Sequence, residues 1–277
     1  MNNTKYSVLM SIYHKEKTEF FITSIESMLE QTVKPDEIVI VKDGPLTQEL
    51  DQVIDKYKNQ EPEMFTIVVL EKNLGLGLAL NEGLKRCRNE LVARMDTDDI
   101  SVKNRCELQI EEFNKNPKLC IVGAWTNEFY DEPENIVTSR IVPEKHKDIM
   151  KFSKRRSPFN HPTVMYKKSA VLACGGYHDV LRKEDIDLFV RMLHNDCLSM
   201  NIPSPLLLFR SNGDNFKRRK AWVNCKSYIS VIYTFWRAGY SNVFDMLYVI
   251  VSQILMFISP IWLLKIISNR FLRKKQN

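Results

Sequence analysis

The chain has 277 residues, of which 44% are hydrophobic and 27% are charged. This composition is typical of one large globular domain or two modest ones, and it excludes disordered and fibrous chains. The six cysteines form no Cys-x-x-Cys pair, so we expect reduced thiols rather than a metal or disulfide framework. The first fifteen residues hold only a short apolar run, so we expect no secretory signal.

Short apolar runs and amphipathic segments alternate along the first hundred residues. The apolar runs predict buried strands over residues 7–12, 37–41, 65–70 and 91–95. Between them, apolar residues recur at helical spacing over 18–31, 46–58 and 73–88. Strands that alternate with helices indicate βαβ units, so we expect an α/β fold with a mostly parallel sheet and helices on both faces.

The pattern is looser from residue 101 to residue 210. It predicts helices over about 102–114 and 185–194, and short strands near 119–125 and 163–166. In an open α/β sheet the ligand lies beyond the carboxyl ends of the strands. We therefore expect this second half to form the other wall of a crevice at that edge of the sheet.

Polar side chains follow each of the four predicted N-terminal strands. They are Tyr13, Asp43, Asn73 and the run Asp96–Asp99. Because the carboxyl ends of parallel strands meet at one edge of a sheet, these side chains are expected to converge on one crevice.

The run Asp96–Asp99 is the strongest candidate for a metal site. The segment after the first strand, residues 13–17, has no glycine, so neither a G-x-G-x-x-G turn nor a P-loop can hold a phosphate there. A cation such as Mg²⁺ or Mn²⁺, bound by carboxylates, could neutralise a phosphate instead. Asp96 and Asp98 could also belong to an ordinary turn or helix cap. Three carboxylates within four residues repel one another unless a cation is present, which favours the metal site.

A second acidic pair, Glu184 and Asp185, opens the predicted helix over 185–194. Asp185 could simply cap that helix. It could instead project into the crevice and serve as a general base.

The C-terminal segment has a separate character. Residues 210–277 hold twelve Lys and Arg against two Asp, a balance of +10, while residues 1–209 carry −4. Residues 246–264 are free of charge and are interrupted by Pro260. An apolar segment flanked by basic clusters favours a helix in the cytoplasmic interface of an anionic membrane, or a re-entrant hairpin, over a simple span. A buried helical pair in a soluble oligomer is the alternative, and we expect no nucleic-acid partner.

The ordered set of motifs over residues 5–210 resembles the family 2 glycosyltransferases. The motifs are Ser-Val-Leu-Met-Ser-Ile-Tyr at 7–13, Val-Lys-Asp-Gly at 41–44, Asn-Leu-Gly at 73–75, Ala-Arg-Met-Asp-Thr-Asp-Asp at 93–99, His-Pro-Thr-Val-Met at 161–165, Gly-Gly-Tyr at 175–177 and Glu-Asp-Ile-Asp at 184–187. The resemblance implies a GT-A fold and an inverting enzyme that uses a nucleotide sugar. It is strongest to bacterial enzymes that build surface polysaccharides on a lipid carrier.

The resemblance also implies residue roles. Asp43 would bind the base of a nucleotide-sugar donor, with UDP as the expected nucleotide. The other donor contacts and the metal contacts would be Ser11, Tyr13, Asn73, Arg94, Asp96 and Asp98. The divalent metal would be Mn²⁺ or Mg²⁺, and Asp185 would be the general base. Acceptor or phosphate contacts would come from His161, Glu184 and Arg210.

Three positions depart from the family pattern. Ser11 and His14 stand where the family usually has Pro and Asn, and Asn212 stands near the place where many relatives have His. The start of the donor pocket is therefore atypical.

These observations combine into one expected function. Residues 1–100 would bind the nucleotide sugar, residues 101–210 would bind the acceptor, and residues 211–277 would associate with the membrane. The enzyme would add one sugar to a lipid-diphosphate-linked saccharide for O-antigen, capsule or exopolysaccharide, at the cytoplasmic face of the bacterial inner membrane. The alternatives are a phosphotransferase or phosphatase that uses Asp96 and Asp98, and an inactive glycosyltransferase-like scaffold.

Overall fold

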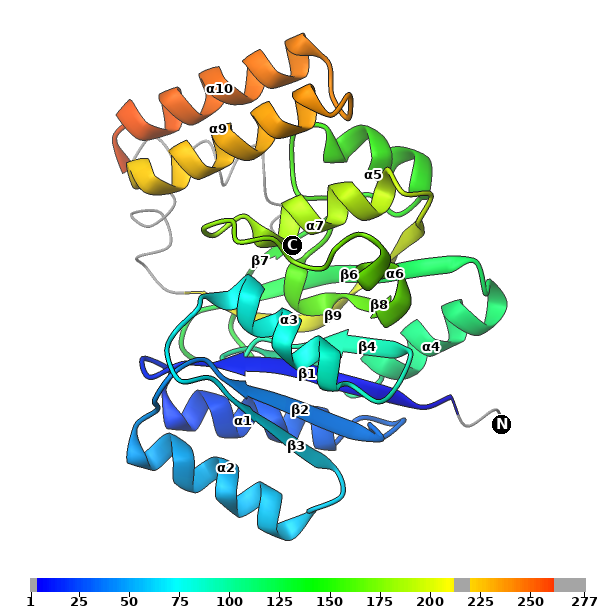
Figure 1. Cartoon of the computed structure of the whole chain (residues 1–277), viewed down its shortest axis with the longest axis vertical. Helices are drawn as coiled ribbons and strands as arrows, with labels where there is room; N and C mark the ends of the chain where they lie inside the picture. The colour runs from blue at the N-terminus through cyan, green and yellow to red at the C-terminus, as the bar shows by residue number, and fades with distance from the viewer. Residues whose placement is uncertain (1–3, 212–219, 262–277) are drawn as a thin grey trace.

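The computed structural model describes residues 4–211 and 220–261, and it confirms the alternation of strands and helices in the first half of the chain (Figure 1). Four parallel strands form there: β1 (Tyr6–Ile12), β2 (Glu37–Lys42), β3 (Phe65–Val69) and β4 (Leu91–Arg94). The helices between them are α1 (Thr18–Leu29), α2 (Gln48–Gln60) and α3 (Leu76–Arg86). Each element lies within a few residues of its predicted range.

Strand β1 lies at the centre of this parallel half. It pairs with β2 on one side, from Ser7 opposite Glu37 to Ile12 opposite Lys42, and with β4 on the other side. This register brings the carboxyl ends of β1, β2 and β4 to the same edge of the sheet. The polar residues that follow these strands therefore lie along that edge.

The second half of the chain extends the same sheet to nine strands, in the order β3-β2-β1-β4-β8-β6-β9-β5 with β7 beside β6. Its strands are β5 (Ile100–Ser101), β6 (Leu119–Phe129), β7 (Ile136–Arg140), β8 (Met165–Lys167) and β9 (Leu198–Arg210). Strands β6 and β9 are parallel, whereas β5, β7 and β8 pair antiparallel with their neighbours. The sheet is therefore mixed, and the expectation of a mostly parallel sheet applies only to its first half. A short connection such as that from β6 to β7 permits only antiparallel pairing.

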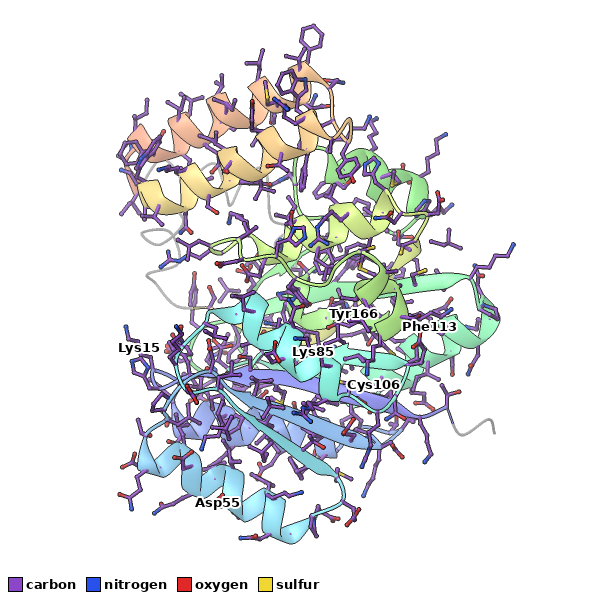
Figure 2. The ribbon with its side chains drawn as sticks, in the orientation of Figure 1. Lys15, Asp55, Lys85, Cys106, Phe113 and Tyr166 are labelled. Atoms are coloured by element: carbon purple, nitrogen blue, oxygen red, sulfur yellow. The ribbon has the colours of Figure 1, made fainter. Side chains whose placement is uncertain are left out.

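Helices cover both faces of the sheet. The helices of the second half are α4 (Arg105–Lys115), α5 (His146–Ser153), α6 (Lys168–Ala173) and α7 (Glu184–Leu193), together with a 3₁₀ turn (His161–Thr163). Because side chains alternate along a strand, Val8 and Met10 of β1 pack with α1, α2 and α4, while Leu9 packs with α3 and α7. Cys106 belongs to the first of these two layers and Tyr166 to the second (Figure 2).

The C-terminal helices α9 (Trp222–Arg237) and α10 (Val243–Ile258) form a hairpin beside α7 (Figure 1). Its buried apolar side chains, among them Val231, Phe235 and Met246, pack against Ile186 and Val190 of α7. Helix α10 ends before Pro260, because proline cannot continue a helix.

Within residues 4–211 and 220–261, no helix has both the length and the apolar character that a bilayer span requires. The basic cluster from Lys265 to Lys275, the end of the predicted apolar run and Asn212 lie outside the described residues.

Candidate active site

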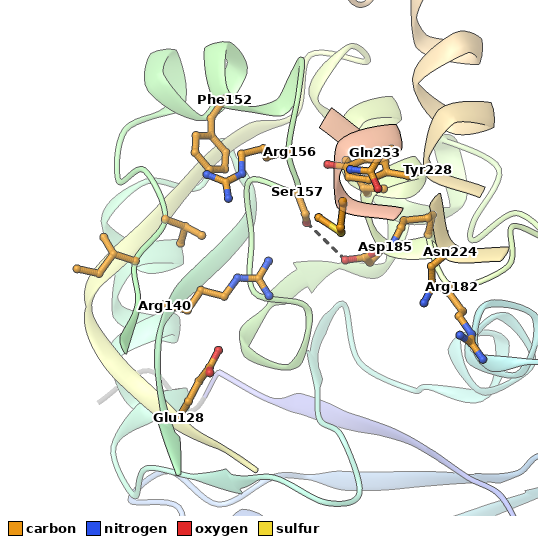
Figure 3. Close-up of a pocket in the computed structure, with 15 residues that line it drawn as sticks. Glu128, Arg140, Phe152, Arg156, Ser157, Arg182, Asp185, Asn224, Tyr228 and Gln253 are labelled. Carbon is orange, nitrogen blue, oxygen red and sulfur yellow. Dashed lines mark hydrogen bonds between the residues drawn. The ribbon is translucent and has the colours of Figure 1, made fainter. Parts of the chain in front are cut away.

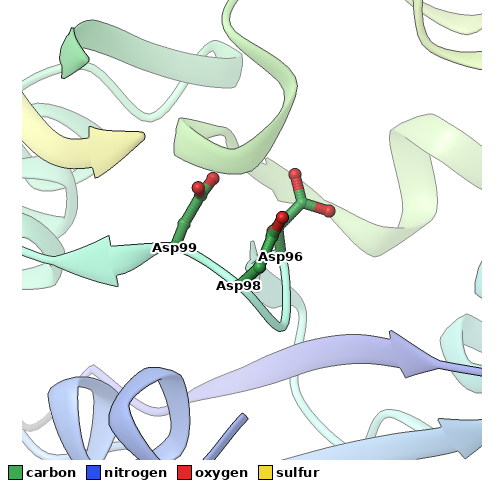
Figure 4. Close-up of side chains that lie close together, drawn as sticks. All are labelled: Asp96, Asp98 and Asp99. Atoms are coloured by element: carbon green, nitrogen blue, oxygen red, sulfur yellow. The ribbon is translucent and has the colours of Figure 1, made fainter. Parts of the chain in front are cut away.

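Three carboxylates gather on the short loop that joins β4 to β5. Asp96, Asp98 and Asp99 each offer an oxygen, and these oxygens lie within 4.8 Å of one another (Figure 4). Asp99 is fully buried, and its Oδ2 has no hydrogen-bond partner among the described residues. A buried carboxylate oxygen without a donor matches a cation ligand, and carboxylates are the donors that Mn²⁺ and Mg²⁺ prefer. The three residues therefore fit a divalent metal.

The electrostatics of the cluster favour a cation as its ligand. Burial, followed by the neighbouring carboxylates of Asp96 and Glu16, raises the pKa of Asp98 from 3.8 to about 7. Burial and the charges of Asp98 and Asp96 likewise raise the pKa of Asp99 well above its ordinary value. A cation between these groups would favour their ionised forms and reverse both shifts.

Arg94 lies behind the cluster and partly compensates its charge. Its side chain is 1% exposed, and its guanidinium donates to Asp96 Oδ1. Burial disfavours the cation, but the carboxylate of Asp96 raises the pKa of Arg94, so the residue stays charged. The nearby Arg105, which is also fully buried, donates to the carbonyl oxygen of Arg94 at 2.7 Å. Arg94 thus orients Asp96 and is itself held by the interior of the sheet.

Contacts from distant segments hold the loop in place. The hydroxyl of Thr97 donates to Glu16 Oε2 at 2.6 Å, and Ser24 of α1 donates to the carbonyl of Asp96 at 2.7 Å. The backbone N–H of Arg210 donates to Asp99 Oδ1 at 2.9 Å, and its Nε donates to the carbonyl of Asp98 at 3.0 Å. The guanidinium of Arg210 also stacks on Phe20 and Phe129, at 3.9 and 4.6 Å from the ring centroids. Arg210, expected as a phosphate contact, therefore braces the acidic loop.

Asp43, expected to bind the donor base, begins the loop between β2 and α2. Its Oδ1 accepts from the N–H of Leu74 at 2.7 Å, and its Oδ2 accepts from the N–H of Gly75 at 3.1 Å. Asn73 donates from its amide to the carbonyl of Asp43 at 3.1 Å. The carboxylate is 4% exposed and holds the start of α3. A base contact would have to use the second lone pair of one of these oxygens.

Ser11 and Tyr13 lie at the carboxyl end of β1, next to the loops that carry Asp43 and the acidic cluster. Ser11 is half-buried, and Tyr13 is 42% exposed. An exposed aromatic ring at this edge is available to a ligand.

His161 and Glu184 lie close enough to Arg94 for its charge to act on both side chains. His161 Nε2 is 3.0 Å from the hydroxyl of Tyr177, and burial together with the charge of Arg94 holds the pKa of His161 well below its ordinary value. Burial and the charge of Asp185 raise the pKa of Glu184 to about 7. A neutral His161 bound to Tyr177 is suited to packing rather than to holding a phosphate by charge.

Asp185 lies on the first turn of α7 and lines a cavity of about 350 Å³ (Figure 3). Its Oδ2 accepts from Ser157 Oγ at 3.4 Å. The neighbouring Asp187 faces elsewhere, because it pairs with Arg191 at 2.6 Å and with His178 at 3.0 Å. Of the two acidic residues, only Asp185 is available to a ligand in that cavity.

The structure brings some of the predicted site residues together and separates others. Asp96, Asp98, Arg94 and Arg210 form one connected group, while Asp185 lines the cavity without Asp96 or Asp98. The cavity also contains basic residues that the sequence did not single out: Arg140, Arg156, Arg182 and Lys183. Their sequence signals are the basic run over residues 154–156 and the adjacent basic pair at 182–183.

Comparison with known proteins identifies the class of protein that this fold and site define. Residues 7–176 match the family described as glycosyl transferase family 2, and the chain belongs to that family. It is 38% identical, over 92% of both chains, to a UDP-Gal:alpha-D-GlcNAc-diphosphoundecaprenol beta-1,3-galactosyltransferase from Escherichia coli. It is 40% identical, over 82% of this chain and 84% of the relative, to the amylovoran biosynthesis glycosyltransferase AmsE from Erwinia amylovora.

A solved structure supports the fold. The mannosyltransferase PcManGT from Pyrobaculum calidifontis, in complex with GDP-Man and Mn²⁺, aligns with a TM-score of 0.63 at 13% identity, over 92% of this chain and 70% of that one. The expected GT-A-like fold and the expected glycosyltransferase family are confirmed. Membership of this family argues against the phosphotransferase or phosphatase alternative.

Proposed function

We propose that the protein transfers one sugar from a UDP-sugar to a lipid-diphosphate-linked saccharide, with inversion at the anomeric carbon. The observation that carries this proposal is the acidic cluster Asp96, Asp98 and Asp99 beyond the end of β4. The name of the galactosyltransferase relative supports both a UDP-linked donor and a diphosphate-linked lipid acceptor. The name of the amylovoran enzyme supports a role in polysaccharide synthesis.

On the donor side, the residues at the ends of β1, β2 and β4 would bind the nucleotide sugar. Asp98 and Asp96 would hold Mn²⁺ or Mg²⁺, which supplies positive charge to the diphosphate as it leaves. Arg94 keeps Asp96 oriented through their ion pair. The exposed ring of Tyr13 and the side chains of Ser11 and Asn73 would line the pocket, with Asp43 fixing its floor.

On the acceptor side, Asp185 would act as the general base. The acceptor hydroxyl attacks the anomeric carbon, a new glycosidic bond forms, and the bond to the diphosphate breaks. Asp185 takes the proton of that hydroxyl, which increases its nucleophilicity. A single in-line displacement of this kind inverts the anomeric configuration. Glu184 and His161 would shape the pocket beside the base.

The hairpin α9–α10 would place the enzyme on the membrane. Its outer surface exposes large apolar side chains: Trp222, Val223, Tyr233, Phe244, Leu247, Tyr248, Val251, Ile254, Leu255 and Ile258. Exposed apolar and aromatic side chains on two adjacent helices are suited to the boundary between lipid headgroups and acyl chains. We propose that residues 211–277 bind the cytoplasmic face of a bacterial inner membrane, where a lipid-linked acceptor lies.

The test uses the full chain with a panel of UDP-sugars, Mn²⁺ and a short-chain lipid-diphosphate saccharide. Asp98→Asn and Asp185→Asn should each lower the transfer rate by about 10²–10⁴-fold while the chain still folds, because each removes one charge from the reacting groups. Asp55→Asn, on the exposed face of α2, is the matched control and should keep full activity. Wild-type rates in both site variants would reject the assigned roles.

A further inference from the structure

The cavity that contains Asp185 is built by two parts of the chain. The catalytic sheet and α7 supply one wall, through Glu128, Arg140 and Asp185. The hairpin supplies the other, through Tyr228 of α9 and Gln253 of α10. A volume of about 350 Å³ is sufficient for a small polar ligand or for one part of a larger one.

Basic side chains dominate the charge of this cavity. Arg140, Arg156, Arg182 and Lys183 line it, against the two carboxylates of Glu128 and Asp185. Within the part of the chain that the structure describes, no carboxylate lies within salt-bridge distance of Arg140, Arg156 or Arg182. The charges of Asp185 and Glu128 reach Arg140 but form no direct ion pair with it. Arginine forks without a directly bound carboxylate suit an anion with paired oxygens, such as a phosphate or diphosphate.

Arg140 points into the space beside the proposed base, and Arg156 and Arg182 line opposite sides of the cavity. Figure 3 shows Arg140 reaching from the end of β7 toward the space between Glu128 and Asp185, with Arg156 on one side. Arg182, on the opposite side, has a φ of 60°, a left-handed backbone conformation that is unfavourable for a residue with a β-carbon. This residue lies two positions before α7 and three positions before Asp185.

The two sides of the hairpin differ in polarity. Asn224, Tyr228 and Gln253 face the cavity, whereas Phe244 and Val251 are among the apolar side chains exposed on its outer surface. The hairpin is fixed to the catalytic half by the ion pair of Arg155 with Asp245 at 2.5 Å and by the bond from Tyr228 to the carbonyl of Arg155 at 2.8 Å. The basic cavity thus lies between the base and a surface suited to lipid.

We propose that this cavity binds the diphosphate of the lipid-linked acceptor, with Arg140, Arg156 and Arg182 as its ligands. This inference rests on the proposed function for the identity of the acceptor. The sugar attached to that diphosphate then lies within reach of Asp185, while the lipid chain leaves along the hairpin toward the membrane. The acceptor diphosphate and the donor diphosphate occupy different sites, one basic and the other acidic and metal-binding.

The experiment measures binding of decyl diphosphate to the full chain by calorimetry, in metal-free buffer with EDTA. Arg140→Gln and Arg156→Gln should each weaken binding about 10-fold or more, because each removes a charged hydrogen-bonding fork. Arg86→Gln, at the exposed end of α3, carries the same substitution away from the cavity and should bind as the wild type does. Asp98→Asn should also retain binding, since the metal cluster is not used. Melting temperatures identify any variant that is misfolded; Arg140 and Arg156 are both exposed, so neither substitution opens the core.

Several outcomes would overturn this assignment. Unchanged affinity in both arginine variants would remove the cavity from the binding site, and lost affinity in Asp98→Asn would move the diphosphate to the acidic cluster. Equal binding of inorganic pyrophosphate and decyl diphosphate would indicate a free phosphate compound rather than a lipid headgroup. Arginine-dependent binding of decyl diphosphate without transfer from any nucleotide sugar would support the anion site and count against the proposed function alone.

Discussion

The acidic loop after β4 holds three carboxylates close together although their negative charges repel one another. Asp98 and Asp99 are forced together by the turn, and the bonds from Arg210 keep them there. Arg94 compensates only one of the three carboxylates directly. The remaining repulsion is visible in the raised pKa of Asp98, about 7. A loop of this kind stores unfavourable electrostatic energy that a bound cation would release.

The pH dependence of metal stabilisation follows from that shift. Because the folded-state pKa of Asp98 lies above its ordinary 3.8, the metal-free protein should lose stability as the pH rises from about 4 through about 7. Mn²⁺ prefers the ionised cluster, so the gain in melting temperature on adding Mn²⁺ should be larger at pH 8 than at pH 5. At a free Mn²⁺ concentration about a hundredfold above Kd, binding adds about 2.7 kcal/mol to the free energy of unfolding. Thermal denaturation checks this, and Asp98→Asn should abolish the difference; equal gains at both pH values in the wild type would contradict it.

At the scale of elements, α3 packs closely against both the parallel half of the sheet and α7. Gly83 rests on β1 and β2: a β-carbon there would come within 2.4 Å of Leu9 Cδ1 and 2.5 Å of Val41 Cγ2. At the other end of α3, a β-carbon on Gly77 would come within 2.9 Å of the β-carbon of Glu184 on α7. Two glycines thus allow α3 to pack tightly against both the sheet and the helix of the proposed base.

Gly83→Ala should therefore destabilise the protein, although the same change in an open helix usually stabilises it by about 0.5–1 kcal/mol. Overpacking against Leu9 and Val41 should lower the free energy of unfolding by roughly 1–3 kcal/mol. Chemical denaturation measures the difference. Arg86→Ala, three residues further along α3 and exposed, should change stability by less than about 0.5 kcal/mol. A stabilising Gly83→Ala would show that α3 can move away from the sheet.

At the scale of the whole molecule, the α/β domain carries a C-terminal helical hairpin, α9–α10, whose outer face is strongly apolar. The inner face of the hairpin is buried against α7, where Phe235 and Met246 pack with Ile186 and Val190. Its outer face leaves side chains such as Phe244, 75% exposed, in contact with water. Isolated exposed apolar residues are ordinary, but a contiguous set over two helices indicates an interaction surface.

Membrane binding should depend on that outer face. The full chain should sediment with vesicles that contain anionic lipid, and Phe244→Gln should weaken binding by about 10-fold, since burial of one large apolar side chain contributes about 1.5–3 kcal/mol. Val69→Gln, a change of another highly exposed apolar residue on β3, should have no effect. If Phe244→Gln binds vesicles as tightly as the wild type, the hairpin does not enter the lipid surface.

Local sequence patterns predict the buried parallel strands of this protein better than its short or irregular strands. The continuous apolar runs predicted β1, β2 and β4 closely, because a strand buried on both faces leaves a strong local signal. Strand β9 was not predicted along its length: it contains Pro203 and Pro205, and its pairing with β6 shifts register near there. Strand β5 has only two residues, too few for any periodicity.

Some residues of the candidate site could be recognised from the sequence, and others could not. The acidic run Asp96–Asp99 could be recognised because its members are neighbours in the chain. Two structural roles could not be recognised from the sequence: Asp43 holds the start of α3, and Arg210 braces the acidic loop. The hydrogen-bond partner of Asp43 lies 31 positions away in the chain, and Arg210 lies 111 positions from Asp99. Hydrogen bonds between such distant segments depend on how the strands are ordered in the sheet.

The sequence by itself determined the family, the α/β character and the presence of carboxylates at the strand ends, because motifs, buried strands and acidic turns are written in contiguous residues. Only the tertiary structure decided that the sheet is mixed, that the C-terminal helices pack on α7, and that Arg140, Arg156 and Arg182 share a cavity with Asp185. The physical reason is that side chains from several elements line a cavity. Whether they meet depends on packing between segments that are far apart in the chain and share no local sequence pattern.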